Sequence, residues 1–265
     1  MTVSWSAYRR ARRRSRQAWA LVILLGVSAA ASVAWFFTAG QFAAAEPAIA
    51  GPTEAPVFDP GFMKPVVPVH AVPRGSAREA LDGLPVKGRA PNDNYEREAF
   101  GQAWQDLDRN GCDTRNDVLR RDLTGVVFTE GSTCRVAAGH FHEPYTGLPV
   151  DFRRGSESSK AVQIDHVVAL GDAWQKGAQR LSPQQRQSLA NDPLNLIAAD
   201  GPANQQKSAG DAATWLPKNK AFRCHYVARQ ISVKAAYGLW VTQPEKDAMK
   251  RVLDSCPQQL TVTAG

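Results

Sequence analysis

The stretch QIDHVVALGDAW, residues 163–174, decides the fold of this 265-residue sequence. Its β-branched apolar residues are typical of a short buried strand, and ALGDAW is typical of a helix that follows. Asp165 and His166 stand side by side where the expected strand ends. An aspartate next to a histidine is common in places that hold no site, so the meaning of this pair depends on the residues further along the chain.

Two more polar motifs follow the pair on the elements that come next. Asn195 stands at the start of NLIAA, a second expected strand, and Asn204 and Lys207 belong to NQQK at the start of an expected helix. A strand, a strand and a helix that carry Asp-His, Asn and Asn-x-x-Lys in this order resemble the ββα-metal finger of HNH endonucleases.

The resemblance extends beyond the finger itself. The segments VQIDHVVALGDAW, ANDPLNLIA, NQQK and WLP look like the HNH domain at the C terminus of GmrSD-type restriction endonucleases, which is also found in exported actinobacterial proteins. With GCDTRNDVLRRDL and EPYTG included, the similarity covers about residues 92–256. It implies a phosphodiester hydrolase that acts on DNA or RNA. The sequence contains no recognisable sequence-reading module, so weak or no sequence specificity is expected.

The resemblance also assigns roles to the residues of the finger. His166 would be the general base, because a histidine with a pKa near 6.5 is mostly neutral at pH 7 and can accept the proton of a water molecule. Asp165 and Asn204 would bind one divalent cation. A carboxylate, an amide oxygen and water molecules suit Mg²⁺ or Mn²⁺. The sequence departs from the simplest HNH pattern because Asn204 replaces the final histidine.

Three further residues receive supporting roles from the same resemblance. Asn195 would hold the loop of the finger and orient the catalytic histidine through a backbone carbonyl. Lys207, one helical turn after Asn204, would face the scissile phosphate, and Arg115 would be a second phosphate contact. The alternative function is a disulfide-stapled extracellular module that binds nucleic acid or a surface polymer without cutting it, in which the finger is only structural.

The N-terminal part of the sequence predicts export. Residues 1–17 form a basic segment with six arginines, and the apolar segment 18–40 is about as long as a bilayer-spanning helix. The sequence AAAE at 43–46 also offers a cleavage site for a signal peptidase. An uncleaved membrane anchor and a cleaved signal peptide therefore both remain open, and either one places the C-terminal domain outside the plasma membrane.

The N-terminal residues 1–45, called the leader below, explain the basic composition. The formal net charge is +7, and the six leader arginines account for all but +1 because residues 1–45 contain no acidic side chain. The high isoelectric point is therefore a sign of topology and gives no independent evidence for nucleic-acid binding.

All four cysteines lie in the exported part, and none forms a CxxC motif. In an oxidising compartment they predict two disulfides, and the pairs that each span one local unit are Cys112 with Cys134 and Cys224 with Cys256.

The exported part divides into a linker and a compact domain. Residues 46–91 are rich in Pro, Ala and Gly and predict an extended tether with one short helix at 76–81. Residues 92–257 predict an α+β domain, in which a small antiparallel sheet carries the finger and helices lie to one side. Its helices are expected at 92–104, 169–179, 182–190, 218–238 and 242–256, and its other strands around VVFT and on both sides of the turn PYTG.

Two other groups of residues could bind metals. Asp106, Asp108 and Asn110 have the spacing that opens an EF-hand calcium loop. Position twelve of this loop is an aspartate in place of the usual glutamate, so the sequence favours a polar turn. His140 and His142 would share one face of a strand, but no third ligand is near them in sequence, and an exposed strand is the favoured interpretation.

Overall fold

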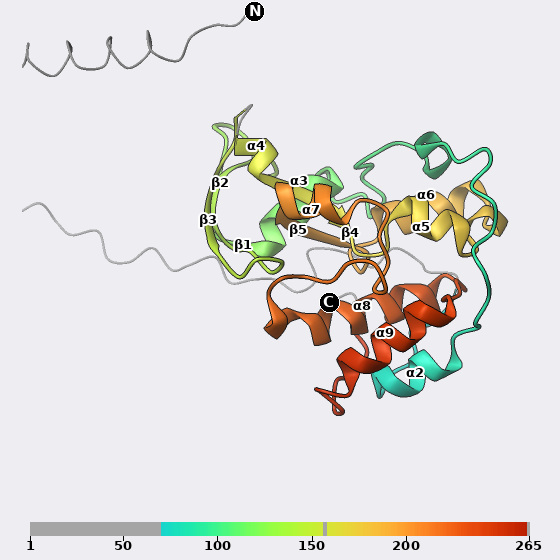
Figure 1. Cartoon of the computed structure of the whole chain (residues 1–265). Coiled ribbons are helices and arrows are strands. Elements are labelled where there is room, and N and C mark those ends of the chain that lie inside the picture. The colour runs from blue at the N-terminus through green and yellow to red at the C-terminus, as the bar shows by residue number, and fades with distance from the viewer. Residues whose placement is uncertain (1–69, 156–157, 264–265) are drawn as a thin grey trace, which may run out of the picture. The chain divides into compact units, whose positions relative to one another are not determined.

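The computed structural model describes residues 70–155 and 158–263 (Figure 1). The predicted basic segment 1–17, the apolar segment 18–40 and the first part of the linker lie outside the described residues. Within the described ranges, no helix is long and apolar enough to cross a lipid bilayer.

The described chain is an α+β structure, as the sequence predicts. Its strands form two antiparallel sheets, one of three strands in the order β1-β2-β3 and one of two strands, β4 and β5. The elements are α2 (Ala77–Gly83), a 3-10 turn (Arg97–Phe100), α3 (Thr114–Asp122), β1 (Leu123–Phe128), β2 (Val136–His142), β3 (Pro149–Arg153), α4 (Ser158–Ala161), β4 (Val162–His166), α5 (Leu170–Gln175), a 3-10 turn (Ala178–Arg180), α6 (Pro183–Asn191), β5 (Leu196–Asp200), α7 (Gly201–Lys207), a 3-10 turn (Lys220–Phe222), α8 (Arg223–Ala236) and α9 (Gln243–Leu253).

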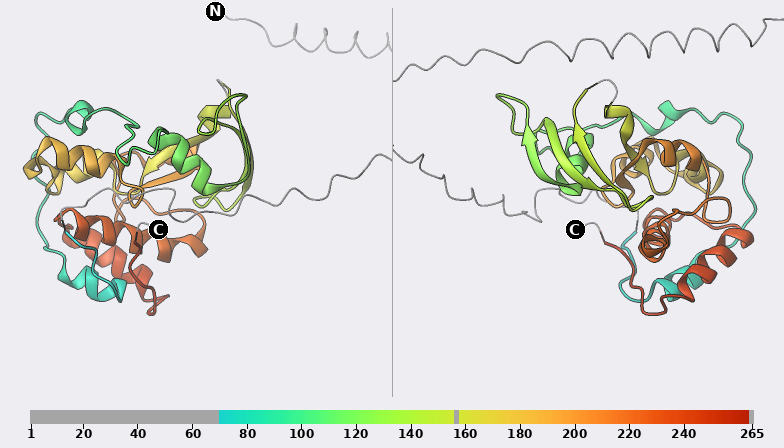
Figure 2. Two further views of the ribbon diagram at one scale, coloured as in Figure 1. Left: turned by 180° about the vertical axis from the view of Figure 1, so that it is seen from behind. Right: turned by 60° about the vertical axis from the view of Figure 1, so that its left-hand side comes forward.

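The three-stranded sheet forms one side of the molecule, and α2, α8 and α9 form the opposite end (Figure 2). Strand β2 alternates buried and exposed side chains near its end, with Phe141 buried between the exposed His140 and His142. This alternation follows from the period of two in a strand. The exposed strand predicted for the two histidines is therefore present, and the Nδ1 atom of His140 lies 2.7 Å from a carboxylate oxygen of Asp151.

Strands β4 and β5 and helix α7 are contiguous in space, although α5 and α6 separate the two strands in sequence. The strands pair antiparallel with Asp165 opposite Ile197 and His166 opposite Leu196. Helix α7 begins directly after β5, where Asp200 caps it by accepting a hydrogen bond from the backbone N–H of Ala203. The predicted order of strand, strand and helix is therefore observed.

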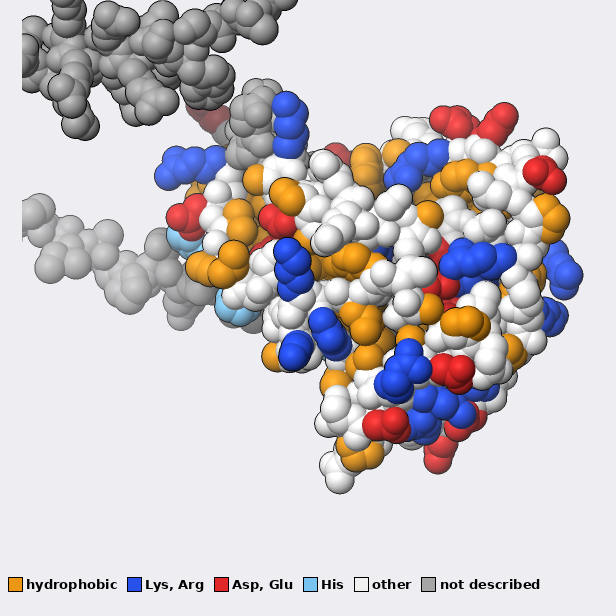
Figure 3. Space-filling model, viewed as in Figure 1, with side chains coloured by type: hydrophobic (Ala, Val, Ile, Leu, Met, Phe, Trp, Pro, Cys, Tyr) orange, Lys and Arg blue, Asp and Glu red, His pale blue; other side chains and the backbone are white. Residues whose placement is uncertain are grey.

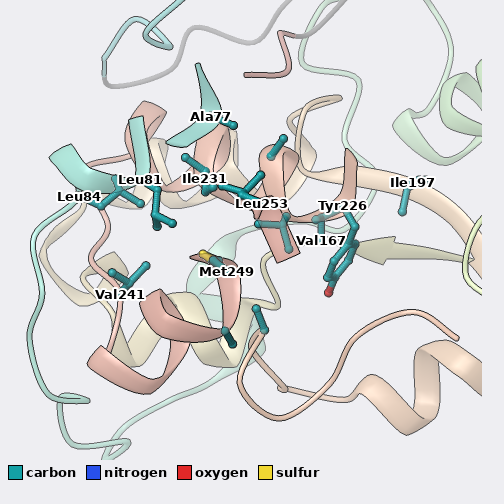
Figure 4. Packing of buried hydrophobic residues seen from close by; sticks show 14 of the residues in the cluster. Ala77, Leu81, Leu84, Val167, Ile197, Tyr226, Ile231, Val241, Met249 and Leu253 are labelled. Atoms are coloured by element: carbon teal, nitrogen blue, oxygen red, sulfur yellow. The ribbon is translucent and has the colours of Figure 1, made fainter. Parts of the chain in front are cut away.

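Helix α8 is the central element of the largest apolar cluster. Figure 4 shows Tyr226, Ile231, Met249 and Leu253 packed together between α8 and α9, with Leu81 contributed by α2. The residues of this cluster are buried and come from the N-terminal, finger and C-terminal parts of the described chain. Burial of apolar side chains stabilises the fold by roughly 25 cal/mol per Å² removed from water, so α8 joins these parts into one unit.

Helix α8 also holds the finger through polar contacts. The guanidinium of Arg229, buried in α8, donates hydrogen bonds to the backbone carbonyls of Pro193, Leu194 and Leu196 at 2.6–2.8 Å. Burial lowers the pKa of Arg229 to about 10, so its side chain stays charged at neutral pH. The amide of Gln230 donates to the carbonyl of Val167 at 3.0 Å, directly after β4.

The short helix predicted at 76–81 is present as α2 (Ala77–Gly83), but the last part of the tether packs against the domain. Helix α2 is capped by Ser76 and buries Ala77 and Leu81 in the main core. Further on, Lys87 and Ala90 donate backbone hydrogen bonds to the carbonyls of Val241 and Gln175. The proline-rich and glycine-rich composition predicts a free linker because the segment has no helical or strand periodicity. Individual backbone N–H groups of the segment nevertheless donate hydrogen bonds to the folded domain.

The helix expected at 92–104 is reduced to the 3-10 turn Arg97–Phe100. Gly101 has φ +78° and Trp104 has φ +59°, and both values are incompatible with a continuing right-handed helix. The apolar side chains whose spacing predicted a helix therefore pack from an irregular backbone. Tyr95 and Phe100 both lie against Trp174, with ring centroids 6.0 and 6.2 Å from it.

Both disulfides have the predicted partners. Cys112 pairs with Cys134, which links the start of α3 to the segment before β2, and Cys224 pairs with Cys256, which links α8 to the end of α9. Each disulfide closes a short loop and so constrains the unfolded chain. This constraint stabilises the folded protein by about 3 kcal/mol per disulfide.

A buried group of charges joins the helices behind the finger. The ammonium of Lys176 lies 2.6–2.7 Å from carboxylate oxygens of Asp172, Asp211 and Glu245, all of them at most 2% exposed. Lys234 pairs with Asp172 and Glu245 at 3.3 and 3.0 Å. Arg89, whose side chain is 35% exposed, also pairs with Asp172 and Asp211, so three cations and three carboxylates share one network.

Candidate functional site

Strand β4 presents its polar side chains to two different neighbours. Gln163 and Asp165 face α7, where Gln163 accepts a hydrogen bond from the amide of Asn204 and Asp165 pairs with Lys207. His166, which points to the other side of the strand, meets α6 and Trp104. Gln163 and Asp165 are two residues apart on the strand, and Asn204 and Lys207 are three apart on the helix. Each pair therefore lies on one face of its element, and the two faces meet.

Asp165 is 5% exposed and accepts two strong hydrogen bonds. The hydroxyl of Tyr145 donates to Oδ2 at 2.5 Å, and the ammonium of Lys207 donates to Oδ1 at 3.0 Å and to the carbonyl of His166 at 2.8 Å. Burial, followed by the charge of Asp165, raises the pKa of Tyr145 well above its usual value, so the phenol stays a neutral donor. Lys207 balances the carboxylate charge inside the protein.

His166 is held by a backbone carbonyl. Its Nε2 lies 2.8 Å from the carbonyl oxygen of Ala190, the penultimate residue of α6. A carbonyl can only accept, so Nε2 carries the hydrogen and Nδ1 is left with its lone pair. The indole ring of Trp104 lies nearly parallel to the imidazole, with centroids 6.2 Å apart and an angle of 15° between the planes.

Burial keeps the imidazole neutral. It lowers the pKa of His166 to about 3, the bond to the carbonyl of Ala190 acts in the opposite direction, and the charges of Arg97 and Lys207 lower the pKa further. The same burial makes His166 a weak base in the free protein. An anionic phosphate that approached the ring would raise this pKa, because an opposite charge stabilises the protonated form.

Two cavities meet at His166. One, of about 370 Å³, is lined by Asp165, His166 and Asn204 and also by Arg97. The other, of about 220 Å³, is lined by Trp104, Arg97 and His166. The structure therefore brings the predicted base and both predicted metal ligands to a single open cavity.

Asn195 contacts segments of the chain near His166 and not the histidine itself. It is completely buried, its Oδ1 accepts the N–H of Val168 at 2.9 Å, and its Nδ2 donates to the carbonyls of Val168 and Leu189 at 3.3 and 3.2 Å. These contacts fix the chain after β4 and the end of α6, next to the Ala190 carbonyl that receives His166. Asn195 is not among the residues that line either cavity.

The donors at the cavity fit a hard divalent cation. A carboxylate offers about four lone-pair positions, and Asp165 uses two of them in the bonds described above. Asn204 donates its amide N–H to Gln163 at 2.9 Å, and no described residue donates to its Oδ1. One carboxylate and one amide oxygen at an open, solvated cavity are donors that Mg²⁺ or Mn²⁺ accepts together with water molecules.

Lys207 and Arg115 lie where the sequence did not place them. Lys207 is 2% exposed and points at Asp165 instead of the cavity surface. The sequence predicts a contact with the scissile phosphate, but Lys207 is the last residue of α7 and pairs with Asp165. Arg115, on α3, donates to the carbonyl of Val162 at 3.2 Å, at the opposite end of β4 from His166. Neither residue lines the cavities beside His166.

The irregular segment before α3 supplies residues that the sequence did not reveal. Arg97 is exposed and is the one Lys or Arg among the described residues that line the two cavities. Trp104 covers one face of His166. The sequence pattern of this segment predicts a helix and does not indicate that either residue lies near His166. The turn PYTG likewise does not indicate that its Tyr145 donates a hydrogen bond to Asp165.

The molecular surface agrees with the near-neutral charge of the exported part. On the face shown in Figure 3, the basic side chains over α2 and α9 alternate with acidic ones. The ammonium of Lys250 lies 2.8 Å from a carboxylate oxygen of Asp82, and Arg78 pairs with Asp254. These charges do not form a continuous basic surface on this face.

Comparison with known proteins places this geometry in a family. The chain matches the family of GmrSD restriction endonucleases, C-terminal domain, over residues 113–252. It is 37% identical over 195 residues to an uncharacterized secreted protein of Arthroderma benhamiae, an overlap of 72% of this chain and 91% of the relative. No solved structure matches the chain. The chain belongs to the family of the GmrSD C-terminal domain and is of the HNH nuclease type.

Proposed function

We propose that this protein is an exported, metal-dependent endonuclease that hydrolyses phosphodiester bonds of DNA or RNA. The observation that carries the proposal is the position of His166. Its Nε2 is bonded to the carbonyl of Ala190, and its imidazole borders the cavity that Asp165 and Asn204 also line.

The reaction requires a water molecule to attack phosphorus while the bond to the leaving oxygen breaks. Nδ1 of His166 is the group that accepts the proton of the water, and the carbonyl of Ala190 stabilises the imidazolium through Nε2. Arg97, at the edge of the cavity, supplies positive charge near the phosphoryl oxygens.

Asp165 and Asn204 are the residues that would hold the cation. Such a cation stabilises negative charge on the phosphoryl oxygens and on the leaving oxygen. Lys207 and Tyr145 fix the direction of the Asp165 carboxylate, since both donate to it. Asn195 keeps the carbonyl of Ala190 in place for His166.

Export is supported by two observations. The relative in Arthroderma benhamiae is described as secreted, and both cysteine pairs form disulfides, which persist in oxidising compartments. We infer an extracellular domain, either released or anchored by residues 18–40.

The metal requirement is the first test. Purified protein with both disulfides intact is expected to nick supercoiled plasmid in 5 mM Mg²⁺ or Mn²⁺ and to lose this activity in excess EDTA. Restored nicking after the cation is added back excludes irreversible damage by the chelator. Undiminished nicking in EDTA would contradict the assignment of Asp165 and Asn204 as ligands of an essential cation.

One observation favours the alternative of a binding module without catalysis. Lys207 already neutralises Asp165 inside the protein, so the finger is stable without a cation. A module of this kind would retain plasmid in a filter-binding assay, leave it supercoiled with Mg²⁺ or Mn²⁺, and show no heat of binding for either ion.

A further inference from the structure

Residues 106–117, a loop that ends in the first turn of α3, have the spacing of a calcium-binding loop. Oxygen-bearing side chains stand at its first, third, fifth and twelfth positions, which are Asp106, Asp108, Asn110 and Asp117. The last position would hold a longer glutamate in the usual pattern. Asp117 has a shorter side chain than glutamate, and for this reason the sequence alone favours a polar turn.

The backbone of the loop is folded around its first residues. Asp106 accepts hydrogen bonds from the backbone N–H groups of Asn110 and Gly111 at 3.1 and 2.9 Å, and Asn110 accepts one from Cys112 at 2.7 Å. Gly111 has φ +89°, which gives the sharp turn at the sixth position. These contacts also suit an ordinary polar turn, so they do not identify a ligand.

Asp117 provides the independent observation. It is 3% exposed, and its buried Oδ1 has no hydrogen-bond partner among the described residues. Burial raises the pKa of Asp117 to about 7; a hydrogen bond from Asn110 acts in the opposite direction, and the charges of Asp108 and Asp106 add to the rise. The carboxylate therefore faces the other acidic residues of the loop, and an unpaired buried carboxylate oxygen needs a partner.

We propose that this loop is a calcium site, separate from the cavity beside His166. Its ligands are the side chains of the four residues at positions one, three, five and twelve and the backbone carbonyl at position seven, namely Asp106, Asp108, Asn110, Asp117 and Cys112. Oxygen donors in a flexible loop suit Ca²⁺ better than Zn²⁺, which prefers nitrogen and sulfur ligands.

The cation would complete this site by drawing its donors together. Among the described residues, no three Asp, Glu, His or Cys side chains are already gathered around one point as a metal site. The proposed set differs from such a group because an amide oxygen and a backbone carbonyl belong to it. The disulfide of Cys112 with Cys134 restrains the loop from outside.

The bound cation would also hold both ends of the loop in place. At one end, Thr114 donates to the carbonyls of Trp104 and Gln105, and Trp104 covers His166. At the other end, α3 carries Arg121, which donates to the carbonyl of Leu196 in β5 at 2.7 Å. The calcium site itself does not depend on the proposed nuclease activity, because none of its ligands lines the cavities beside His166.

The test is the thermal unfolding of the full chain with both disulfides intact, in calcium-free buffer with 5 mM Mg²⁺ and after addition of 5 mM Ca²⁺. We expect Ca²⁺ to raise the Tm of the wild type by about 5 °C. In Asp117→Asn, the calcium-dependent shift disappears. Without Ca²⁺ this variant unfolds at or above the temperature of the wild type, because the buried unpaired charge is gone.

Asp113→Asn is the matched control. Asp113 lies in the same acidic loop, is exposed and caps α3 by accepting the N–H of Asn116 at 2.8 Å, a role that asparagine also fills. It is expected to keep the full calcium-dependent shift. Loss of the shift in this control as well would identify diffuse charge screening and overturn the proposal.

Calorimetric titration covers the case in which Asp117→Asn fails to fold. The wild type is expected to bind one equivalent of Ca²⁺ in 5 mM Mg²⁺, and Asp108→Asn to bind it at least tenfold more weakly. No calcium binding by the wild type, or unchanged binding by Asp108→Asn, would overturn the site. Either outcome leaves the nicking assay unaffected, so the two proposals fail separately.

Discussion

Replacing His166 by alanine is expected to slow plasmid nicking by about 10²–10⁴-fold, which is the usual contribution of a general base. The substitution removes the imidazole of His166, which lines the cavity, and leaves Asp165 and Asn204 unchanged. The rate is measured as the loss of supercoiled plasmid in excess Mg²⁺. A folded variant that nicks at the wild-type rate would contradict the role of His166.

Two controls separate chemistry from structure in this experiment. His166→Gln offers an amide N–H that can donate to the carbonyl of Ala190 but provides no base, so we expect it to be as inactive as the alanine variant. His140→Ala changes an exposed histidine on β2 and should keep the wild-type rate. Near-ultraviolet circular dichroism reports whether Trp104 and the other aromatic side chains keep their packing.

Replacing Lys176 by methionine is expected to lower the free energy of unfolding by about 3–5 kcal/mol. Lys176 is completely buried, and its ammonium pairs with Asp172, Asp211 and Glu245. Methionine fills a similar volume but leaves these three carboxylates with two cations. For a domain of this size, the loss corresponds to a fall in Tm of about 10 °C.

The matched control for Lys176 is Lys250→Met on the surface. Lys250 pairs with Asp82 at 2.8 Å, but the two side chains are 38% and 51% exposed. An exposed pair contributes about 0–1 kcal/mol, so this variant should unfold close to the wild type. Urea unfolding of both variants gives the comparison. Equal stabilities would show that Lys234 and Arg89 suffice to balance the network.

The part of the site that could be predicted from sequence is the part that lies on regular elements. Asp165, His166 and Asn204 stand on a strand and a helix that follow each other in a recognisable order, and the structure brings them to one cavity. The cysteine pairs were predictable because each spans a short local unit. Local pattern and spacing were sufficient in both cases.

The residues that were missed depend on contacts across the fold. Arg97 and Trp104 come from a segment whose helical spacing is interrupted by positive φ angles, and nothing in the sequence shows that it folds over His166. The burial of Lys207 follows from its partner on β4, 42 residues earlier. Lys176 and Glu245, 69 residues apart, are brought together only by the packing of separate helices.

We propose that Asp165, His166 and Asn204 form a cation-dependent cutting site. Anomalous X-ray diffraction from crystals soaked in Mn²⁺ is the most direct test, because the manganese signal locates the ion independently of the protein chain. We expect an anomalous peak in the cavity that Asp165, His166 and Asn204 line. Absence of that peak in a protein that nicks plasmid with Mn²⁺ would contradict this assignment.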